Sequence, residues 1–193
     1  MTDLHSTLRR IHGDLTDLGV PFALVGGLAV SALTEPRFTR DADFAVAVSD
    51  DAGAERLINQ LQSRGYLTHT VLEHQATGRL ATVRLTHTGS DPGPVVDLLF
   101  ASSGIECEVV DAALSMRLLE DVTLPVAGLG HLIALKVLSR DDRERPQDLV
   151  DLRTLLRSAS PNDLLVAEGA LELIEGRGYH RGKDLLADLR SLR

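Results

Sequence analysis

A pair of glycines between an apolar run and a helical pattern most constrains how this chain folds. The run "PFALVGG", residues 21–27, is typical of a short buried strand that ends at Gly26 and Gly27. The stretch "GLAVSALT" then favours a helix, which Pro36 closes. Because glycine has no side chain, backbone N–H groups at such a junction can approach an anion closely. The sequence therefore predicts a strand, a tight turn and a helix start that can bind phosphate.

The next strand pattern carries two acids. In "DADFAVAV", residues 41–48, side chains alternate between faces, so Asp41 and Asp43 share one face while Phe44 points into the core. Neighbouring carboxylates repel each other and resist burial. A divalent cation offsets this, since Mg²⁺ typically binds one or two carboxylates together with substrate phosphates. The alternative is a solvated strand end, because the D-x-D pattern is short and common.

The rest of the pattern predicts an α+β fold: a mixed sheet flanked by helices over residues 1–128, and a helical subdomain over 129–193 packed on it. Further helices are expected over 3–18, 50–65, 130–140, 145–157, 161–176 and 181–192. Further strands are expected over 66–72, 79–86 and 94–101, with short edge strands over 105–110 and 123–127.

Composition narrows the classes of protein. The formal net charge of −8 argues against a broad nucleic-acid-coating surface, although local basic patches are compatible with it. Only Lys136 and Lys183 among the 20 basic residues are lysines.

No apolar run reaches the roughly 18 residues of a membrane span, and the first residues lack the order of a signal peptide, so we expect a cytoplasmic protein without a membrane partner. The single Cys107 excludes an internal disulfide, and its neighbours predict a buried thiol in a strand.

The stretch "GGLAVSALTEPRFTRDADF" resembles the first motif of DNA-polymerase-β-like nucleotidyltransferases, and its Gly-Gly, R-x-T and D-x-D pieces are similar to the AbiEii/MenT toxin branch. "PVVDLLFA" supplies a third acid, Asp97, whose alternative role is as partner of an arginine. "HLIALKVLSR" supplies Lys136 and Arg140 one helical turn apart, although a surface lysine is the alternative. "RPQDLVDL" matches the last motif but has Gln147 where a basic residue is usual, and its Asp148 also suits a helix start.

The resemblance implies that the mixed sheet is nucleotidyltransferase-like, and it implies a role for each matched residue. Asp41, Asp43 and Asp97 would bind Mg²⁺ or Mn²⁺ and act in catalysis. Lys136 and Asp148 would also be catalytic. The nucleoside triphosphate would be bound by a group of five residues: Gly26, Gly27, Arg40, Lys136 and Arg140. Arg37 is a second candidate for a phosphate contact.

The resemblance also implies partners. Enzymes of the MenT type are toxins of bacterial toxin–antitoxin systems that add nucleotides, often pyrimidines, to the 3′ end of tRNA and block aminoacylation. We therefore expect CTP or UTP, a tRNA acceptor and a cognate antitoxin. Because some antitoxins of this branch resemble kinases, Thr39 is a candidate regulatory phosphorylation site beside the metal site. The tRNA contact would fall on a group of arginines: Arg140, Arg143, Arg145, Arg153 and Arg157.

Two other functions remain open from the sequence. An adenylyltransferase of small molecules such as aminoglycosides would use the same metal site, and the acidic charge favours a cationic substrate. A non-catalytic binding module of the same fold would not need all four of Asp41, Asp43, Asp97 and Lys136. The C-terminal "GRGYHRGKDL" resembles the tails of the branch, and Arg181 and Lys183 within it either contact nucleic acid or lie on a solvated helix start.

Overall fold

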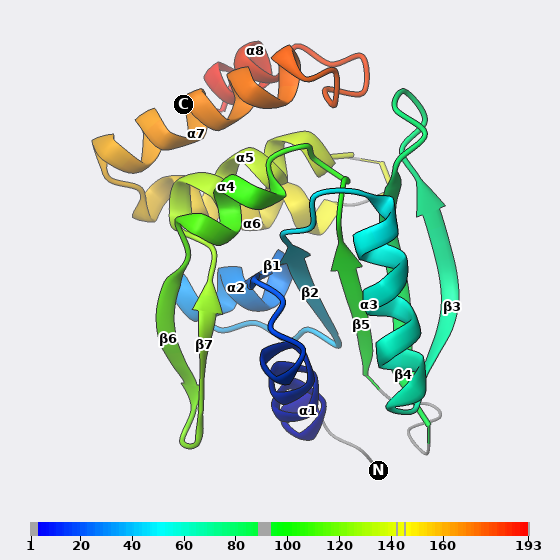
Figure 1. Ribbon diagram of the computed structural model, residues 1–193. Coiled ribbons are helices and arrows are strands. Elements are labelled where there is room, and N and C mark those ends of the chain that lie inside the picture. The colour runs from blue at the N-terminus through cyan, green and yellow to red at the C-terminus, as the bar shows by residue number, and fades with distance from the viewer. Residues whose placement is uncertain (1–3, 89–93, 142, 145, 193) are drawn as a thin grey trace.

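A computed structural model describes residues 4–88, 94–141, 143–144 and 146–192, which form an α+β fold around one mixed sheet (Figure 1). Within these described residues, seven strands form the sheet in the order β3-β4-β5-β2-β1-β7-β6. The pairs β2–β5 and β1–β7 are parallel, and the other neighbours are antiparallel. The strands are β1 (Phe22–Val25), β2 (Asp41–Val46), β3 (Tyr66–Glu73), β4 (Leu80–His87), β5 (Val95–Leu99), β6 (Leu114–Leu119) and β7 (Val122–Val126). The helices are α1 (Leu4–Asp17), α2 (Gly26–Leu33), α3 (Asp51–Ser63), α4 (Glu106–Asp111), α5 (Leu129–Ser139), α6 (Pro146–Ser158), α7 (Pro161–Gly176) and α8 (Leu185–Arg190).

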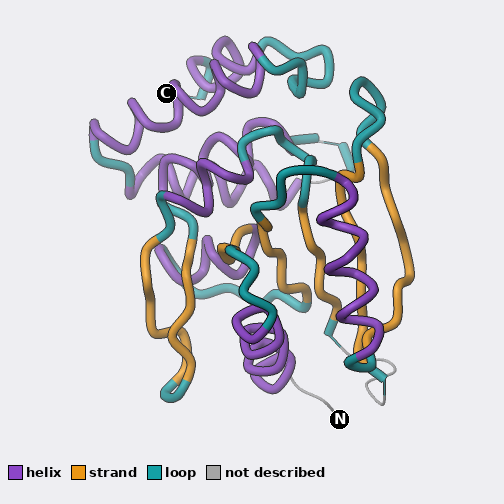
Figure 2. The backbone as a smooth tube through the Cα atoms, in the orientation of Figure 1, coloured by secondary structure: helices purple, strands orange, loops and turns teal. Residues whose placement is uncertain are grey.

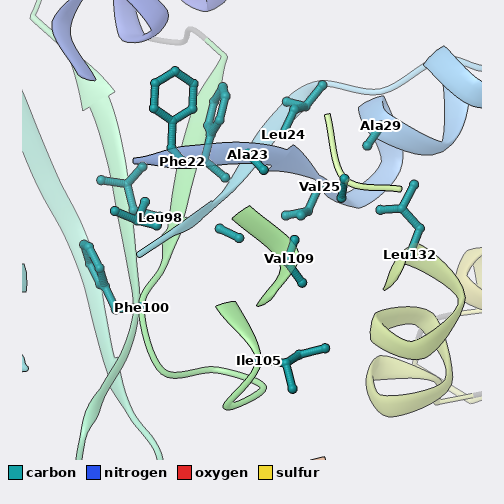
Figure 3. Close-up of a cluster of buried hydrophobic side chains, with 14 of the residues drawn as sticks. Phe22, Ala23, Leu24, Val25, Ala29, Leu98, Phe100, Ile105, Val109 and Leu132 are labelled. Carbon is teal, nitrogen blue, oxygen red and sulfur yellow. The ribbon is translucent and has the colours of Figure 1, made fainter. Parts of the chain in front are cut away.

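The centre of the sheet lies in the core because its strands are apolar. All four residues of β1 are buried, and Phe22 packs edge-on against Phe44 of β2 with their ring centroids 5.8 Å apart. Helix α1 buries Leu8, Ile11 and Leu15 at helical spacing, as its sequence pattern predicts. Figure 3 shows side chains from β1, α2, β5, α4 and α5 converging in this core. Continuous apolar packing thus holds the central strands in fixed register.

The C-terminal helices gather beyond one end of the strands, above the sheet in Figure 1. Helix α5 is buried along most of its length, including His131 and Lys136. Helix α7 begins with a capping box, in which Ser160 and Asp163 exchange side-chain and backbone hydrogen bonds. Figure 2 shows these helices packed beside one another, apart from the strands. Within the residues described, no helix combines the length and apolar character needed to cross a membrane.

The strand expected over 105–110 is wrong. These residues form α4, in which Glu106 and Val109 are buried while Cys107 is exposed, so the expected buried thiol is wrong as well. The alternation of Ile105, Cys107 and Val109 is also compatible with a strand. The helix forms because the buried Glu106 carboxylate accepts hydrogen bonds from the Ser102 and Ser103 backbone N–H groups. These hydrogen bonds hold the turn by which the chain leaves the sheet between β5 and α4.

Two further differences lie near sheet and helix ends. The sequence pattern does not predict the edge strand β6, because none of its residues is buried and it therefore lacks a clear apolar alternation. The strand expected over 123–127 is confirmed as β7. It was expected at an edge of the sheet, but it lies between β1 and β6. The last helix begins only at Leu185 and not at residue 181, because Arg181 and Gly182 have positive φ angles of 56° and 73°.

Candidate active site

A row of polar side chains crosses four neighbouring strands on one face of the sheet. Thr70 on β3 is opposite Arg84 on β4, Arg84 is opposite Asp97 on β5, and Asp97 is opposite Asp43 on β2. Asp41 is on the same face as Asp43, two residues earlier in β2. The register therefore brings together the three acids that the sequence analysis singled out, although Asp97 is far from the other two along the chain.

The Gly-Gly turn lies directly against this row. Gly26 adopts a left-handed backbone with φ +65°, and a Cβ there would lie 1.9 Å from Oδ2 of Asp43. Any other residue at this position would thus be strained and would also displace the carboxylate. A Cβ on Gly27 would lie 2.3 Å from Nη2 of Arg37. Because the two glycines lack side chains, the Asp43 carboxylate and the Arg37 guanidinium can pack against the first turn of α2.

The third acid is held by an arginine. Nε of Arg84 donates to Oδ1 of Asp97 at 2.9 Å, and Nη2 donates to Oδ2 at 2.7 Å. Asp97 is buried, whereas the Arg84 side chain is 47% exposed. The hydrogen bond from Arg84 to Asp97 raises the pKa of the guanidinium above its ordinary value, with smaller contributions from the charges of Asp41 and Asp43. Arg84 is thus electrostatically coupled to all three acids.

A buried ion network forms the opposite side of the site. Nζ of Lys136 on α5 lies 2.6 Å from Oδ1 of Asp148 and 2.9 Å from Oδ2 of Asp151, both on α6. Oγ of Ser139 donates to the other Asp148 oxygen at 3.1 Å. The Lys136, Asp148 and Asp151 side chains are each less than one tenth exposed. These contacts fix the lysine at the end of the cleft nearest α6.

Arg37 joins this network to the Gly-Gly turn. Its Nε and Nη2 each donate to one oxygen of Asp151 at 2.7 Å. Burial acts to raise the pKa of Asp151, but the hydrogen bonds from Arg37 and Lys136 outweigh it and leave the pKa below the ordinary value. Asp151 therefore stays ionised and links the loop after α2 to α5 and α6.

The acids, the glycines and the ion network line one cleft of about 810 Å³. Among the sequence-predicted residues, the cleft lining includes Gly26, Gly27, Thr39, Asp41, Asp43, Asp97, Lys136 and Asp148. Arg40 and Arg140 are not among the described lining residues. The exposed Arg40 guanidinium lies 5.5 Å from the centroid of the Phe38 ring, and the backbone carbonyl of Arg140 accepts a hydrogen bond from Lys183 at 2.6 Å. Arg37 is thus the arginine of this loop that lines the cleft.

Sequence reasoning missed Arg84 and the whole surface that surrounds it. The β3–β4 wall, as we name it, consists of Thr70 and Leu72 on β3, Thr82 and Arg84 on β4, and the adjacent Leu99 at the end of β5. In "RLATVRLT" the alternation of Thr82 and Arg84 with buried Ala81 and Val83 marks these two as sharing the face opposite the core. It does not show which strand lies beside them, so the pairing with Asp97 depended on the sheet order.

The C-terminal loop places Arg181 at the cleft. The Arg181 guanidinium donates to the Ser102 carbonyl at 3.2 Å, and the backbone of Arg181 is left-handed. Nearby, Tyr179 packs on Gly104, where a Cβ would lie 2.5 Å from its ring, and against His74 with ring centroids 4.2 Å apart. Lys183, by contrast, donates to the carbonyls of Leu138 and Arg140 at the end of α5. Arg181 is thus a cleft residue, and Lys183 holds the loop on α5.

The arginines expected to contact tRNA are dispersed. Arg153 and Arg157 on α6 line a second, more open groove of about 510 Å³ together with three leucines, outside the described lining of the acidic cleft. Arg143 is exposed in the loop before α6. Arg145 lies outside the described residues.

The donor chemistry of the cleft fits a hard divalent cation. Asp41, Asp43 and Asp97 present carboxylate oxygens from adjacent strands on one face, which are the ligands that Mg²⁺ and Mn²⁺ prefer. In the described part of the chain, no group of three or more His, Cys, Asp or Glu side chains is arranged as it stands to hold a metal ion. The Asp97 carboxylate faces Arg84 in this arrangement, so a cation at all three acids requires side-chain movement.

Comparison with solved structures supports the fold. Lincosamide adenylyltransferase LnuA with bound lincomycin is 15% identical, with a TM-score of 0.53 over 82% of this chain and 100% of that chain. ANT(2″)-Ia in complex with adenylyl-2″-tobramycin is 12% identical, with a TM-score of 0.57 over 89% and 97%. An antigenic nucleotidyltransferase-like protein from Paracoccidioides brasiliensis is 17% identical, with a TM-score of 0.56 over 97% and 92%. No curated protein sequence matches this chain.

The family comparison covers nearly the whole chain. Residues 13–193 match the model of the nucleotidyl transferase AbiEii toxin family, type IV toxin–antitoxin system. This match includes the Gly-Gly turn, all three acids and the ion network, and the fold is the one expected from the sequence resemblance. The chain therefore belongs to the AbiEii toxin family and is a nucleotidyltransferase.

Proposed function

We propose that this enzyme is the toxin of a bacterial toxin–antitoxin pair and transfers a nucleoside monophosphate, a pyrimidine in preference, from its triphosphate to the 3′ end of tRNA. The acceptor hydroxyl attacks the α-phosphate, pyrophosphate leaves, and the modified tRNA end no longer accepts an amino acid. The observation that carries the proposal is the convergence of Asp41, Asp43 and Asp97 beside a Gly-Gly helix start. The cognate antitoxin would restrain this activity in the cytoplasm.

The three acids are the proposed metal ligands. Asp41 and Asp43 come from one strand and Asp97 from its parallel neighbour, so their side chains project from one face of the sheet. Bound Mg²⁺ or Mn²⁺ would neutralise charge on the attacking and leaving oxygens of the in-line displacement. Asp97 would also accept the proton of the acceptor hydroxyl.

The triphosphate would occupy the side of the cleft formed by α2 and α5. The N–H groups at the start of α2 and the positive end of its helix dipole favour phosphate beside Gly26 and Gly27. The Lys136 ammonium has three N–H donors, and two of them point to carboxylate oxygens of Asp148 and Asp151. We propose that its third donor meets the triphosphate and that the two acids hold it in place for that contact.

The β3–β4 wall favours an anionic acceptor over a cationic one. Its lining residues are two threonines, two leucines and Arg84, and Arg181 lies on the same cleft. A polycationic aminoglycoside needs acidic partners beyond the metal ligands, and the described residues of this wall contain none. Phosphates of an RNA end fit hydroxyl and guanidinium donors. The overall charge of −8 is compatible with this because Arg84 and Arg181 line this part of the cleft, although Glu144 lines the cleft as well.

The test is transfer of label to tRNA. Purified protein with Mg²⁺ is incubated with total bacterial tRNA and each α-³²P-labelled nucleoside triphosphate in turn. We expect label in the tRNA band, strongest with CTP or UTP, and its loss in Asp41→Ala. Asp17→Ala is the matched control, since its side chain is 71% exposed on α1, and it should label like wild type. Labelling that persists in Asp41→Ala contradicts the proposed site.

A second candidate is a small-molecule nucleotidyltransferase. The net charge of −8 favours a cationic acceptor, and the fold is shared with LnuA and ANT(2″)-Ia. The discriminating assay presents lincosamides and aminoglycosides with ATP in place of tRNA and detects pyrophosphate. Release of pyrophosphate with these acceptors, and no label on tRNA, would favour this candidate.

Thr39 is the proposed point of regulation. It lines the cleft, and its hydroxyl lies 3.4 Å from the backbone oxygen of Asp41. A phosphate on Thr39 would add about −1.5 to −2 charges beside the acids and compete for cations and arginines. Intact mass spectrometry after co-expression with the antitoxin should show one added phosphate, absent in Thr39→Val. An unchanged mass would rule out this mode of regulation.

A further inference from the structure

We propose that Arg84 is the internal counter-ion of the acid cluster and makes the binding of a divalent cation at Asp97 depend on bound nucleotide. The inference rests on the proposed metal-dependent function and adds a residue that no sequence motif singled out. In the free enzyme Arg84 would hold Asp97 and disfavour a cation there. When the triphosphate arrives, Arg84 would turn to its α-phosphate, which has to lie beside the acids for the in-line attack, and would release the carboxylate.

The first support is geometric. Both oxygens of Asp97 accept an N–H of the same guanidinium, at 2.9 and 2.7 Å, in the parallel fork that arginine forms with carboxylates. The strand register places Arg84 opposite Asp97, and Asp97 opposite Asp43. A cation that uses the Asp97 carboxylate therefore meets a positive charge already paired with it.

The second support is the charge balance. Asp97 is buried and Asp43 is half-buried against Gly26, so water screens the repulsion between the two acids only in part. Arg84 offsets part of the negative charge of the cluster, because its guanidinium donates to both oxygens of Asp97. The Coulomb attraction between the acids and a bound divalent cation is therefore weaker than it would be without Arg84.

The third support is the exposure of the arginine toward the cleft. Its side chain is 47% exposed and lines the cleft, whereas that of Asp97 is 10% exposed. Thr70, its neighbour on β3, has a short side chain that leaves the guanidinium beside open cleft volume. Arginine binds phosphate in the same forked geometry as carboxylate, so a triphosphate offers Arg84 an equivalent partner. Nucleotide and cation would then bind cooperatively.

The experiment measures Mn²⁺ binding, not activity. Free Mn²⁺ is counted by electron paramagnetic resonance during titration of the full-length protein, with and without a non-hydrolysable CTP analogue. Because the analogue itself chelates Mn²⁺, a protein-free titration of the analogue provides the baseline. Wild type is compared with Arg84→Gln and Arg84→Lys. Arg117→Gln is the matched control, because Arg117 is an exposed arginine on the far edge strand β6.

We expect Arg84→Gln to bind Mn²⁺ at least about tenfold more tightly than wild type in the absence of nucleotide, a factor within the usual range of coupled sites. The nucleotide should tighten Mn²⁺ binding in wild type and do so less in the variant. Arg84→Lys, which keeps the charge but loses the fork, should fall between the two. When Asp97→Asn is added to both wild type and Arg84→Gln, their difference in Mn²⁺ affinity should disappear, which assigns it to this carboxylate.

Three results separate failure of this inference from failure of the proposed function. Equal Mn²⁺ affinity of wild type and Arg84→Gln without nucleotide overturns the inference and leaves the metal-dependent function intact. Absence of Mn²⁺ binding in every folded variant, with or without nucleotide, overturns both. If Arg84→Gln does not fold by circular dichroism, the comparison of wild type with Arg84→Lys decides, and equal affinity there overturns the inference.

Discussion

Asp43 on β2 and Asp97 on β5 lie directly opposite each other in a parallel pair of strands. Parallel neighbours require a long connection, and here α3, β3 and β4 lie between the two strands along the chain. Two acids at one register position in a largely apolar sheet repel each other, and the fold offsets this with Arg84 on the next strand. The acid pair is thus tolerated because the sheet supplies a cation beside it.

The Gly-Gly turn gives the first prediction. Gly26→Ala places a Cβ against the Asp43 carboxylate and forces a left-handed backbone on alanine, so we expect transferase activity to fall at least about 100-fold, as for a misplaced catalytic group. Initial rates of label transfer measure this. Gly13→Ala is the control, since open space surrounds that glycine on α1, and its rate should remain within about twofold of wild type.

The ion network gives a prediction for stability. The buried Asp151 carboxylate forms ion pairs with Arg37 and Lys136. Asp151→Asn removes its negative charge and leaves the two cations without enough opposite charge beside them. We expect the free energy of unfolding to fall by about 3–5 kcal/mol in urea titrations. Asp121→Asn breaks an exposed pair with Arg9 and should cause a much smaller loss. Equal losses for the two variants would refute a structural role of the network.

Buried His131 on α5 gives a pH prediction. Burial lowers its pKa below the ordinary value of 6.5, so the folded state resists protonation. Its contribution to stability is complete above pH 6.5 and is lost as the pH falls through the lower folded-state pKa. The midpoint of urea unfolding should therefore change less in His131→Gln than in wild type as the pH falls from about one unit above 6.5 to lower values. His74, whose pKa is also lowered by burial, keeps part of the dependence, and exposed His5→Gln should leave it unchanged.

The C-terminal loop gives a prediction for acceptor binding. Arg181→Gly removes the guanidinium while the left-handed backbone suits glycine, so stability should stay within about 1 kcal/mol of wild type. We expect KM for tRNA to rise about tenfold, which corresponds to one lost charged contact. Steady-state kinetics with variable tRNA measure this, and Arg181→Lys should recover part of the loss. An unchanged KM in Arg181→Gly would exclude the contact.

Much of the site could be predicted because its residues carry local signals. Gly26, Gly27, Asp41 and Asp43 lie within one strand–turn–helix–strand unit, where short-range pattern and turn chemistry are informative. Asp97 and Lys136 are recognisable as charged residues within apolar runs. Their convergence in one cleft, by contrast, is implied only by family resemblance and required the sheet order and the packing of α5 to become visible.

The errors have physical causes as well. The sequence of helix α4 also fits a strand because alternating apolar residues suit both structures in so short a segment, and the deciding contact is the Glu106 carboxylate on the preceding loop. Strand β6 escapes prediction because an exposed edge strand buries too little to need an apolar alternation. The nucleotide contact of Arg40 stays a prediction, whereas the fold places Arg37 on the cleft and pairs it with Asp151 on α6.

The sequence by itself determined the local units of this protein: the amphipathic helices, the Gly-Gly turn, the strand with two acids and the isolated acid and lysine in apolar surroundings. These follow from periodicity and backbone preference, which act over a few residues. Only the tertiary structure decided which charges pair. Arg84 meets Asp97, and Arg37 meets Asp151, because strand order and helix packing bring together groups distant along the chain, and Coulomb and hydrogen-bond energies depend on distance in space.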